Sequence, residues 1–505
     1  MLRMVTVKSG KVEGLPAADP RITAYKGIPY AAPPVGELRW RVPQPAKNWQ
    51  GVLKAYKFGP VPMQRILGTD PDNIYTREWF VDPDIEMSED SLTLNVWTPA
   101  KSADEKLPVF IWYYGGGYSE GMSAEMELDG ERIARRGIVV VTVNYRVNAF
   151  GFLAHPELTA ENPDAPTNFG FYDQRMANIW VRENIAAFGG DPDNITIGGQ
   201  SAGGGSVLSQ MASPLTKGLF KRVIVESGVS QMVYMTPTLR GVSMEQAERT
   251  GREFFDALGV KTLAEARALD ATVIRDTFYK HKFFFYPPVD NVFQVGNHHE
   301  LIMNGNCDVK PMLFGHTANE LYAVPKVKSI EELKAFAAEH FGEDAPEFLR
   351  LVESKIGSIT ESLSKARLPS LEFTCLFFGE MKARTNDKTP LYYYVFRPEI
   401  PGWDNPGCFH SVDLWFFFET LAKCWRPFVG KHYDLSRQMC NYWANFIKSG
   451  DPNGTDADGS DMPLWEPYSV DNPCRMTFGD KAYPDYAGPS KLVRFLLDHE
   501  LKKRG

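Results

Sequence analysis

The sequence predicts an α/β fold, in which a large and mostly parallel central sheet is covered by helices. Between about residues 90 and 320, short β-branched apolar runs alternate with segments of helical pattern. The apolar runs are continuous instead of alternating with polar residues, which is typical of strands that are buried on both faces. Hydrophobic residues make up 43% of the 505 residues, which is enough to form a large core.

The predicted strands are short apolar runs that are rich in Val, Ile, Phe and Tyr. In chain order they cover residues 92–97, 108–114, 137–145, 194–199, 222–227, 311–315 and 391–396. Helical patterns separate most of these runs, so neighbouring strands are expected to be joined by crossover connections and to run parallel.

Helices are predicted between the strands and at the carboxyl end. Ser243 with Gln246, and Ser329 with Glu332, have the spacing of capping boxes. Segment 490–505 places four apolar side chains on one helical face, namely Leu492, Val493, Leu496 and Leu497. We expect this face to dock on the core. A self-association surface is the alternative, so the sequence allows a monomer or a homodimer.

The domain organisation is predicted to be one domain over residues 1–505. No internal repeat and no linker rich in Gly, Ser or Pro divides the chain. Residues at about 230–300 and 325–390 are helical or irregular by pattern. We interpret these two segments as insertions that cap the functional site above the sheet.

Composition excludes several function classes. The 55 Lys and Arg residues against 63 Asp and Glu residues give a net charge of −8, which disfavours a nucleic acid partner. The longest apolar stretches are strand-sized, so no membrane span is predicted, and the amino end lacks the apolar core of a secretory signal. The six cysteines are widely spaced without a CxxC pair, and no metal site is predicted. A cytoplasmic location is expected.

The strongest local motif is the pentapeptide of residues 199–203, which has the pattern G-x-S-x-G between a predicted strand and a helical segment. A turn of this kind holds its serine in a strained and accessible position. Ser201 is therefore the candidate nucleophile. A serine hydroxyl is unreactive on its own and needs a base, which in turn needs an orienting carboxylate.

Both partners can be found further along the chain, in the order that follows from this motif. Glu320 lies in the loop after the predicted strand 311–315, and His410 follows the strand 391–396 and a loop rich in Pro and Gly. Three glycines at 115–117 follow the strand 108–114. Such a run can direct backbone N–H groups at a developing negative charge.

The chain resembles the type B carboxylesterase and cholinesterase family of the α/β-hydrolase fold. The resemblance covers nearly the whole length, and its motifs lie at residues 25–45, 88–99, 113–121, 168–204, 409–418 and 446–454. It implies a carboxylic ester hydrolase that acts on small-molecule esters and needs no cofactor.

The resemblance also implies the roles of six site residues. The family's nucleophile corresponds to Ser201, its acid to Glu320 and its base to His410. The oxyanion hole corresponds to the N–H groups of Gly116, Gly117 and Ala202. The implied reaction is acyl transfer in two steps, through an acyl-enzyme on the serine.

Two features depart from the family pattern, at three positions. Gln200 stands where the family usually has Glu, so a choline-type preference is not expected and neutral esters are. The two cysteines of an early disulfide loop would align with Pro62 and Ser91, so that disulfide is absent, which indicates a reducing compartment.

Substrate specificity remains open at the level of sequence. Phe283, Phe284 and Phe285 fall where the family often builds its acyl pocket, although core packing explains them equally well. Tyr118 adds an aromatic edge near the glycine run. Short-chain esters and aromatic esters, including hydroxycinnamoyl esters, are both candidate substrates. Amide or thioester hydrolysis by the same triad, and a non-catalytic binding protein of the same fold, are the alternative functions.

Overall fold

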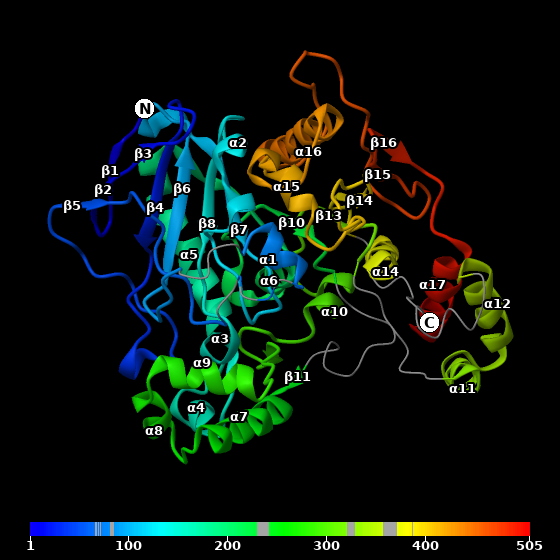
Figure 1. The fold of residues 1–505 in the computed structure, drawn as a ribbon, viewed down its shortest axis with the longest axis horizontal. Coiled ribbons are helices and arrows are strands. Elements are labelled where there is room, and N and C mark those ends of the chain that lie inside the picture. Colours follow the sequence, from blue (N-terminus) through cyan, green and yellow to red (C-terminus); the bar gives the residue numbers. More distant parts are fainter. Residues whose placement is uncertain are drawn as a thin grey trace.

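The predicted fold class is confirmed by the computed structural model, in which helices surround one large, mostly parallel sheet (Figure 1). The structure describes residues 1–65, 68, 70, 72–80, 85–229, 242–320, 329–356, 371–385 and 387–504. Within this part of the chain the main sheet has 11 strands. In spatial order they are β16 (Ala482–Asp485), β15 (Arg475–Phe478), β14 (Leu391–Phe396), β13 (Met312–Thr317), β10 (Arg222–Glu226), β9 (Gly190–Gln200), β7 (Leu107–Tyr113), β8 (Val139–Val143), β6 (Thr93–Thr98), β4 (Thr23–Pro29) and β3 (Leu15–Pro16).

The central strands of this sheet are parallel and its two edges are antiparallel. All pairs from β8 through β7, β9, β10, β13 and β14 to β15 are parallel. The outer pairs β15–β16, β8–β6, β6–β4 and β4–β3 are antiparallel. Every residue of β8, β13 and β14 is buried, so both faces of the central sheet are covered, as the continuous apolar runs predicted.

Two smaller sheets complete the strand content of the described residues. Strands β1 (Met4–Val7), β2 (Gly10–Glu13) and β5 (Val52–Lys54) form one, and the parallel pair β11 (Val242–Ser243) and β12 (Pro288–Val289) forms the other.

Sixteen α-helices are described outside the strands. The α-helices are α1 (Ile74–Glu78), α2 (Glu131–Ala134), α3 (Asn148–Phe152), α4 (Pro156–Glu161), α5 (Phe169–Asn184), α6 (Ala202–Ala212), α7 (Met244–Leu258), α8 (Leu263–Ala268), α9 (Ala271–Lys280), α10 (His298–Met303), α11 (Ile330–Phe341), α12 (Ala345–Ile356), α14 (Leu371–Ala383), α15 (Asp413–Phe417), α16 (Gly430–Ser449) and α17 (Lys491–Arg504). Short 3₁₀ turns include η3 (Met126–Leu128) and η8 (Leu421–Lys423). None of the described helices is both long and apolar enough to cross a membrane.

The two predicted insertions take different positions. Helices α7 and α9 pack against each other and α9 packs on α3, near α4 and α8 at the bottom of Figure 1. Helices α11 and α12 pack together, and α12 contacts α17 beside α14 at the right of Figure 1. Parts of both insertions, residues 230–241, 325–328, 357–370 and 386, lie outside the described residues.

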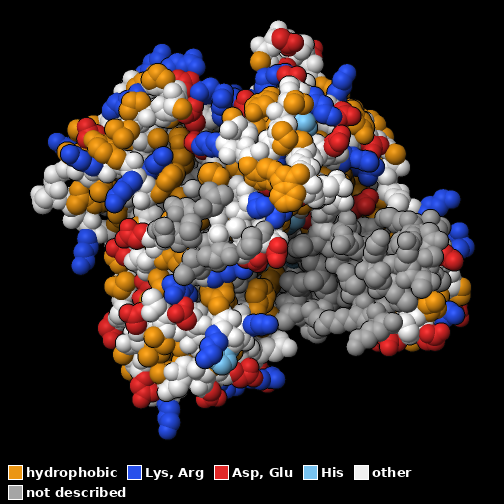
Figure 2. Space-filling view, in the orientation of Figure 1, with side chains coloured by type: hydrophobic (Ala, Val, Ile, Leu, Met, Phe, Trp, Pro, Cys, Tyr) orange, Lys and Arg blue, Asp and Glu red, His pale blue; other side chains and the backbone are white. Residues whose placement is uncertain are grey.

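The C-terminal helix docks on the core, as its apolar face predicted. Leu492, Val493, Leu496 and Leu497 are all buried, and α17 packs on α12 and α14. The predicted cap at Ser243 is also present, since its hydroxyl accepts from the Gln246 N–H while the Gln246 side chain accepts from the Ser243 N–H. All six cysteines are free. On the face shown in Figure 2, Lys and Arg side chains are interspersed with Asp and Glu side chains.

Candidate active site

Ser201 occupies a strained turn between β9 and α6. Its backbone has φ 54° and ψ −123°, a conformation that side-chain-bearing residues rarely adopt and that is found mainly at functional sites. Its N–H donates to the Glu226 carbonyl at 2.9 Å, which ties the turn to β10. A Cβ on Gly203 would lie 2.1 Å from the Tyr113 carbonyl oxygen, so only glycine lets the turn pass this close to β7.

A cavity of about 420 Å³ opens above this turn. Ser201, Gln200 and His410 line one side of it, together with the three glycines at 115–117. Aromatic side chains supply much of the remaining wall, namely Tyr75, Trp79, Phe80, Trp112, Tyr114 and Phe284. The cavity wall is thus mostly apolar with a smaller number of polar side chains, which is the usual form of a small-molecule site.

Glu320 forms a short hydrogen bond with His410, which lines the cavity. Glu320 follows β13, and its Oε2 lies 2.6 Å from His410 Nδ1. The other carboxylate oxygen accepts from the Ser227 hydroxyl and, at 3.0 Å, from the Thr317 N–H. Both side chains are buried, so the carboxylate is held rigidly and fixes the orientation of the imidazole.

The electrostatics of this pair favour its charged form. Burial on its own raises the pKa of the Glu320 carboxyl, but His410 and the Ser227 hydroxyl outweigh burial and lower that pKa to about 2. Burial likewise disfavours the imidazolium of His410, but the Glu320 carboxylate outweighs burial and raises the pKa of His410 above its ordinary 6.5. Glu320 is therefore a carboxylate at neutral pH and can stabilise a protonated His410.

Gln200 contacts the far nitrogen of the same imidazole. The Gln200 amide nitrogen lies 3.1 Å from His410 Nε2. Because Nδ1 donates its hydrogen to Glu320, Nε2 of the neutral ring carries the lone pair, so the Gln200 amide donates to it. The described structure has no hydrogen bond between Ser201 and His410. The Gln200 amide instead bonds to His410 Nε2, which is the atom that the Ser201 hydroxyl would have to bond to. Such bonds often form only with substrate bound.

The pH dependence of activity follows from the pair. The family resemblance implies that His410 is a general base, which must be neutral to act, so kcat/KM for a neutral ester is expected to rise with pH along a one-proton curve with its midpoint above 6.5. In Glu320→Gln the midpoint is expected to fall, because burial then acts on the imidazolium without the compensating carboxylate. A pH–rate series on both proteins measures this.

The matched control for this series is Asp413→Asn. Burial raises the pKa of Asp413 to about 7, so this group also titrates near neutrality. Its carboxylate accepts from the Tyr394 hydroxyl at 2.8 Å and not from His410. A midpoint that moves more in Asp413→Asn than in Glu320→Gln would show that the curve belongs to Asp413.

The glycine run has a backbone conformation that favours glycine. Gly116 and Gly117 have φ of 101° and 63°. A Cβ on Gly116 would lie 2.1 Å from the Glu120 carbonyl oxygen, which excludes a larger residue. Ala202 is the first residue of α6, where N–H groups have no intrahelical partner. Among the described hydrogen bonds, none uses the N–H of Gly116, Gly117 or Ala202.

The aromatic run divides between cavity and core. Phe284 is 50% exposed and lines the cavity. Phe285 is buried and packs against Phe254 and Phe278, and Phe283 packs on Phe254 and Phe285.

Of the two interpretations of the aromatic run, Phe283 and Phe285 therefore agree with core packing, and neither lines the cavity. Tyr118 also packs away from the cavity, since it is buried edge-on against Phe152 and Phe171. The described helices of the second insertion, α11 and α12, also contribute no residue to the cavity wall.

Several residues at the site were not singled out from the sequence. Ser227 follows β10 directly and could have been found by examining the carboxyl end of every predicted strand. Arg65 and Glu120 form an ion pair on the cavity wall. Glu125 also lines the cavity, and burial raises the pKa of its carboxyl to about 7. The sequence around Arg65, Glu120 and Glu125 has no motif that would have indicated a place at the site.

Comparisons with known proteins show which family and which solved structures the chain resembles. A protein-family model, described as "Carboxylesterase family", matches residues 2–352 and 359–486 of this chain. A para-nitrobenzyl esterase of Bacillus subtilis (strain 168) is 32% identical over 478 residues, which cover 89% of this chain and 91% of that protein. A cholinesterase of Mus musculus is 31% identical over 508 residues, which cover 92% of this chain and 81% of that protein. Among solved structures, a PNB esterase has a TM-score of 0.79 at 28% identity and covers 98% of this chain and 99% of that chain.

Proposed function

The chain belongs to the carboxylesterase family and is a carboxylic ester hydrolase, and we propose that it hydrolyses neutral esters through an acyl-enzyme on Ser201. The observation that carries the proposal is the 2.6 Å hydrogen bond between Glu320 and His410 at the cavity that Ser201 lines. A carboxylate, an imidazole and a strained serine at one cavity are the parts that acyl transfer needs.

In the first step, His410 Nε2 takes the proton of the Ser201 hydroxyl as the serine oxygen attacks the ester carbonyl carbon. For this the Gln200 amide must release Nε2 to the serine. The Glu320 carboxylate stabilises the imidazolium that forms. The N–H groups of Gly116, Gly117 and Ala202 donate to the carbonyl oxygen as it becomes negative, and each such donor typically contributes about 10²- to 10³-fold in rate.

The tetrahedral intermediate then breaks its bond to the alcohol oxygen. His410 gives its proton to that oxygen, the alcohol leaves, and the acyl group remains on Ser201. In the second step a water molecule loses a proton to the same Nε2 and attacks the acyl carbon. The intermediate collapses, the serine oxygen regains the proton, and the carboxylic acid is released.

A panel of p-nitrophenyl esters with acyl chains of different length, together with one aromatic ester, tests this function. Turnover of at least one ester, with a burst of p-nitrophenol in proportion to enzyme, is expected. A p-nitroanilide and a thioester of the preferred acyl group form the second arm of the panel. Faster turnover of the anilide or the thioester than of the ester would refute the proposal in favour of another acyl-transfer reaction. No turnover of any compound would refute it in favour of a binding role.

Phe284 is proposed to contact the acyl group of aromatic esters. Phe284→Ala is expected to lower kcat/KM for a phenyl-bearing ester such as a hydroxycinnamate by about fivefold, because a half-exposed ring contributes roughly 1 kcal/mol of apolar contact. The value for p-nitrophenyl acetate, whose acyl group carries no ring, is expected to change little.

The neighbouring substitution Phe285→Ala is the matched control. Its ring is buried in the core, so its loss is expected to lower the free energy of unfolding by about 3–5 kcal/mol while the preference between the two esters stays as in wild type. Denaturant unfolding and the ratio of the two kcat/KM values separate the roles. An unchanged ratio in Phe284→Ala would remove Phe284 from the acyl site.

Gln200 is proposed to disfavour cationic alcohols. A neutral amide next to His410 gives a quaternary ammonium group no countercharge, so kcat/KM for butyl butyrate is expected to be several-fold higher than for butyrylcholine. Gln200→Glu is expected to narrow this ratio, and Gln200→Met, which has similar size and no charge, is expected to preserve it. A wild-type preference for butyrylcholine would contradict the assignment.

A further inference from the structure

A second cavity lies at the edge of the sheet, away from Ser201. It has a volume of about 360 Å³ and is formed by β3, β4 and β6 together with residues 129–132 and 419–423. We call it the edge pocket. The edge pocket shares no lining residue with the active-site cavity. The two come near each other at the end of the turn η3, where Leu128 lines the active-site cavity and the next residue, Asp129, lines the edge pocket.

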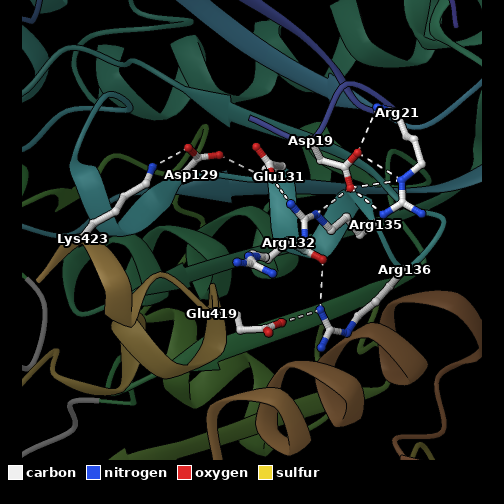
Figure 3. Close-up of polar contacts among 9 residues, drawn as sticks. All are labelled: Asp19, Arg21, Asp129, Glu131, Arg132, Arg135, Arg136, Glu419 and Lys423. Carbon is white, nitrogen blue, oxygen red and sulfur yellow. Dashed lines mark hydrogen bonds and ion pairs between the residues drawn. The ribbon is translucent and has the colours of Figure 1, made fainter. Parts of the chain in front are cut away.

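The three carboxylates that line the edge pocket are all paired with cations (Figure 3). Asp129 binds Lys423, which also lines the pocket. The other two are bound by arginines outside the lining. Glu131 binds Arg135, and Glu419 accepts from Arg136 at 2.8 Å. The negative charges of this surface are therefore compensated before any ligand enters.

Two cations of the pocket have no such counter-ion. Arg132 lines the pocket, and within the described part of the chain no hydrogen bond or ion pair engages its guanidinium, from which Figure 3 draws no dashed line. Lys26 also lines the pocket, and its Nζ lies 4.3 Å from the centroid of the Phe58 ring with no ion pair to a described carboxylate. Burial lowers the pKa of Lys26, and this effect outweighs the attraction of the Asp129 carboxylate, which forms its ion pair with Lys423. The pocket therefore carries an excess of positive charge.

A further part of the wall of the edge pocket is apolar. The Trp97 side chain is almost completely buried in β6 yet borders the pocket, and Pro16, Ala17 and Ala24 continue this wall. A ligand that matched both the cations and the apolar residues would carry one anionic group and one apolar group. An inorganic anion would leave the exposed side chains of Leu15 and Pro16 uncovered, and a neutral apolar molecule would leave two cations partly buried without a partner.

We propose that the edge pocket binds a small organic monocarboxylate, with the carboxylate at Arg132 and Lys26 and the apolar group against Trp97. A guanidinium matches a carboxylate through two parallel hydrogen bonds, and an unpaired arginine is free to make them. The volume lies within the range of about 300–1,000 Å³ that small-molecule sites occupy. The inference depends on the edge pocket alone and not on the reaction at Ser201.

Calorimetric titration with 4-bromobenzoate tests the proposal. Wild type is expected to bind this carboxylate saturably, and Arg132→Gln and Lys26→Gln are each expected to weaken binding by about tenfold. Arg21→Gln is the matched control, because Arg21 belongs to the same charged cluster, is 75% exposed and does not line the pocket. It is expected to bind as wild type does. Equal affinity in Arg132→Gln, Lys26→Gln and wild type would overturn the proposal.

Crystals soaked in the same compound give an independent readout. The anomalous signal of bromine is expected beside Trp97, with the carboxylate at Arg132. An organic carboxylate site would be refuted if bromine were found only in the cavity that Ser201 lines. It would also be refuted if sulfate bound as tightly as 4-bromobenzoate in the titration. Thermal unfolding of each variant verifies that a loss of binding is not a loss of fold.

Discussion

Replacing Ser201 by alanine is expected to lower kcat for the preferred p-nitrophenyl ester by about 10⁴- to 10⁶-fold. The substitution removes the atom that forms the acyl bond, while the backbone N–H groups around it remain. Residual catalysis by the oxyanion donors sets the lower limit of the rate. Alanine has a Cβ like serine, so the strained backbone at φ 54° is retained and the variant is expected to fold.

Ser209→Ala is the control for this experiment. Ser209 lies on the same helix α6 but is buried and contacts His298, away from the cavity. Its loss is expected to leave kcat within about threefold of wild type. Mass spectrometry after reaction with an organophosphate is expected to place the phosphoryl group on Ser201. Wild-type rates in Ser201→Ala, or labelling at another serine, would assign the nucleophile elsewhere.

The sequence could predict the centre of the fold because burial there is complete. All seven predicted strands are present as β6, β7, β8, β9, β10, β13 and β14. Their continuous apolar runs are a direct result of helices covering both faces of the sheet. The edge strands were not predicted, since β3 has two residues and β4 is interrupted by a bulge between Tyr25 and Ile28. Short and irregular edge strands leave little periodic pattern.

The chemistry-bearing residues could be found from the sequence where the chemistry fixes their local backbone. The turn at Ser201 needs glycine at positions 199 and 203, and these leave a motif. The contact of Gln200 with His410 leaves none, because it joins side chains 210 positions apart. It became visible only when the fold brought the carboxyl ends of β9 and β14 to the same edge of the sheet.

The aromatic run at 283–285 shows why specificity is harder to predict than mechanism. In an extended segment alternate side chains point to opposite sides, so Phe283 and Phe285 share one side and Phe284 takes the other. The sequence contains that alternation. It does not say which side faces the cavity, because that depends on how helices α7 and α9 pack, and their rings enclose Phe285.

Glu320→Gln is expected to lower kcat by about 10³- to 10⁴-fold and to leave KM nearly unchanged. A glutamine side chain fits the same space and can still accept from Ser227. It carries no charge, however, so the imidazolium that forms as Ser201 attacks is buried without a counter-ion. The Gln amide can also donate to Nδ1 and favour the tautomer whose Nε2 bears hydrogen, which cannot accept the serine proton.

Asp413→Asn separates this role from a general loss of buried negative charge. Asp413 is as buried as Glu320 and lies three residues after His410, but its carboxylate is bound by Tyr394. We expect kcat in Asp413→Asn to fall by less than about tenfold. If Asp413→Asn lost as much activity as Glu320→Gln, the orienting carboxylate would be Asp413, and the 2.6 Å bond from His410 to Glu320 would have to break in the working enzyme. Since that bond already fixes Nδ1 as the donor, the prediction is that only Glu320 controls the tautomer of His410.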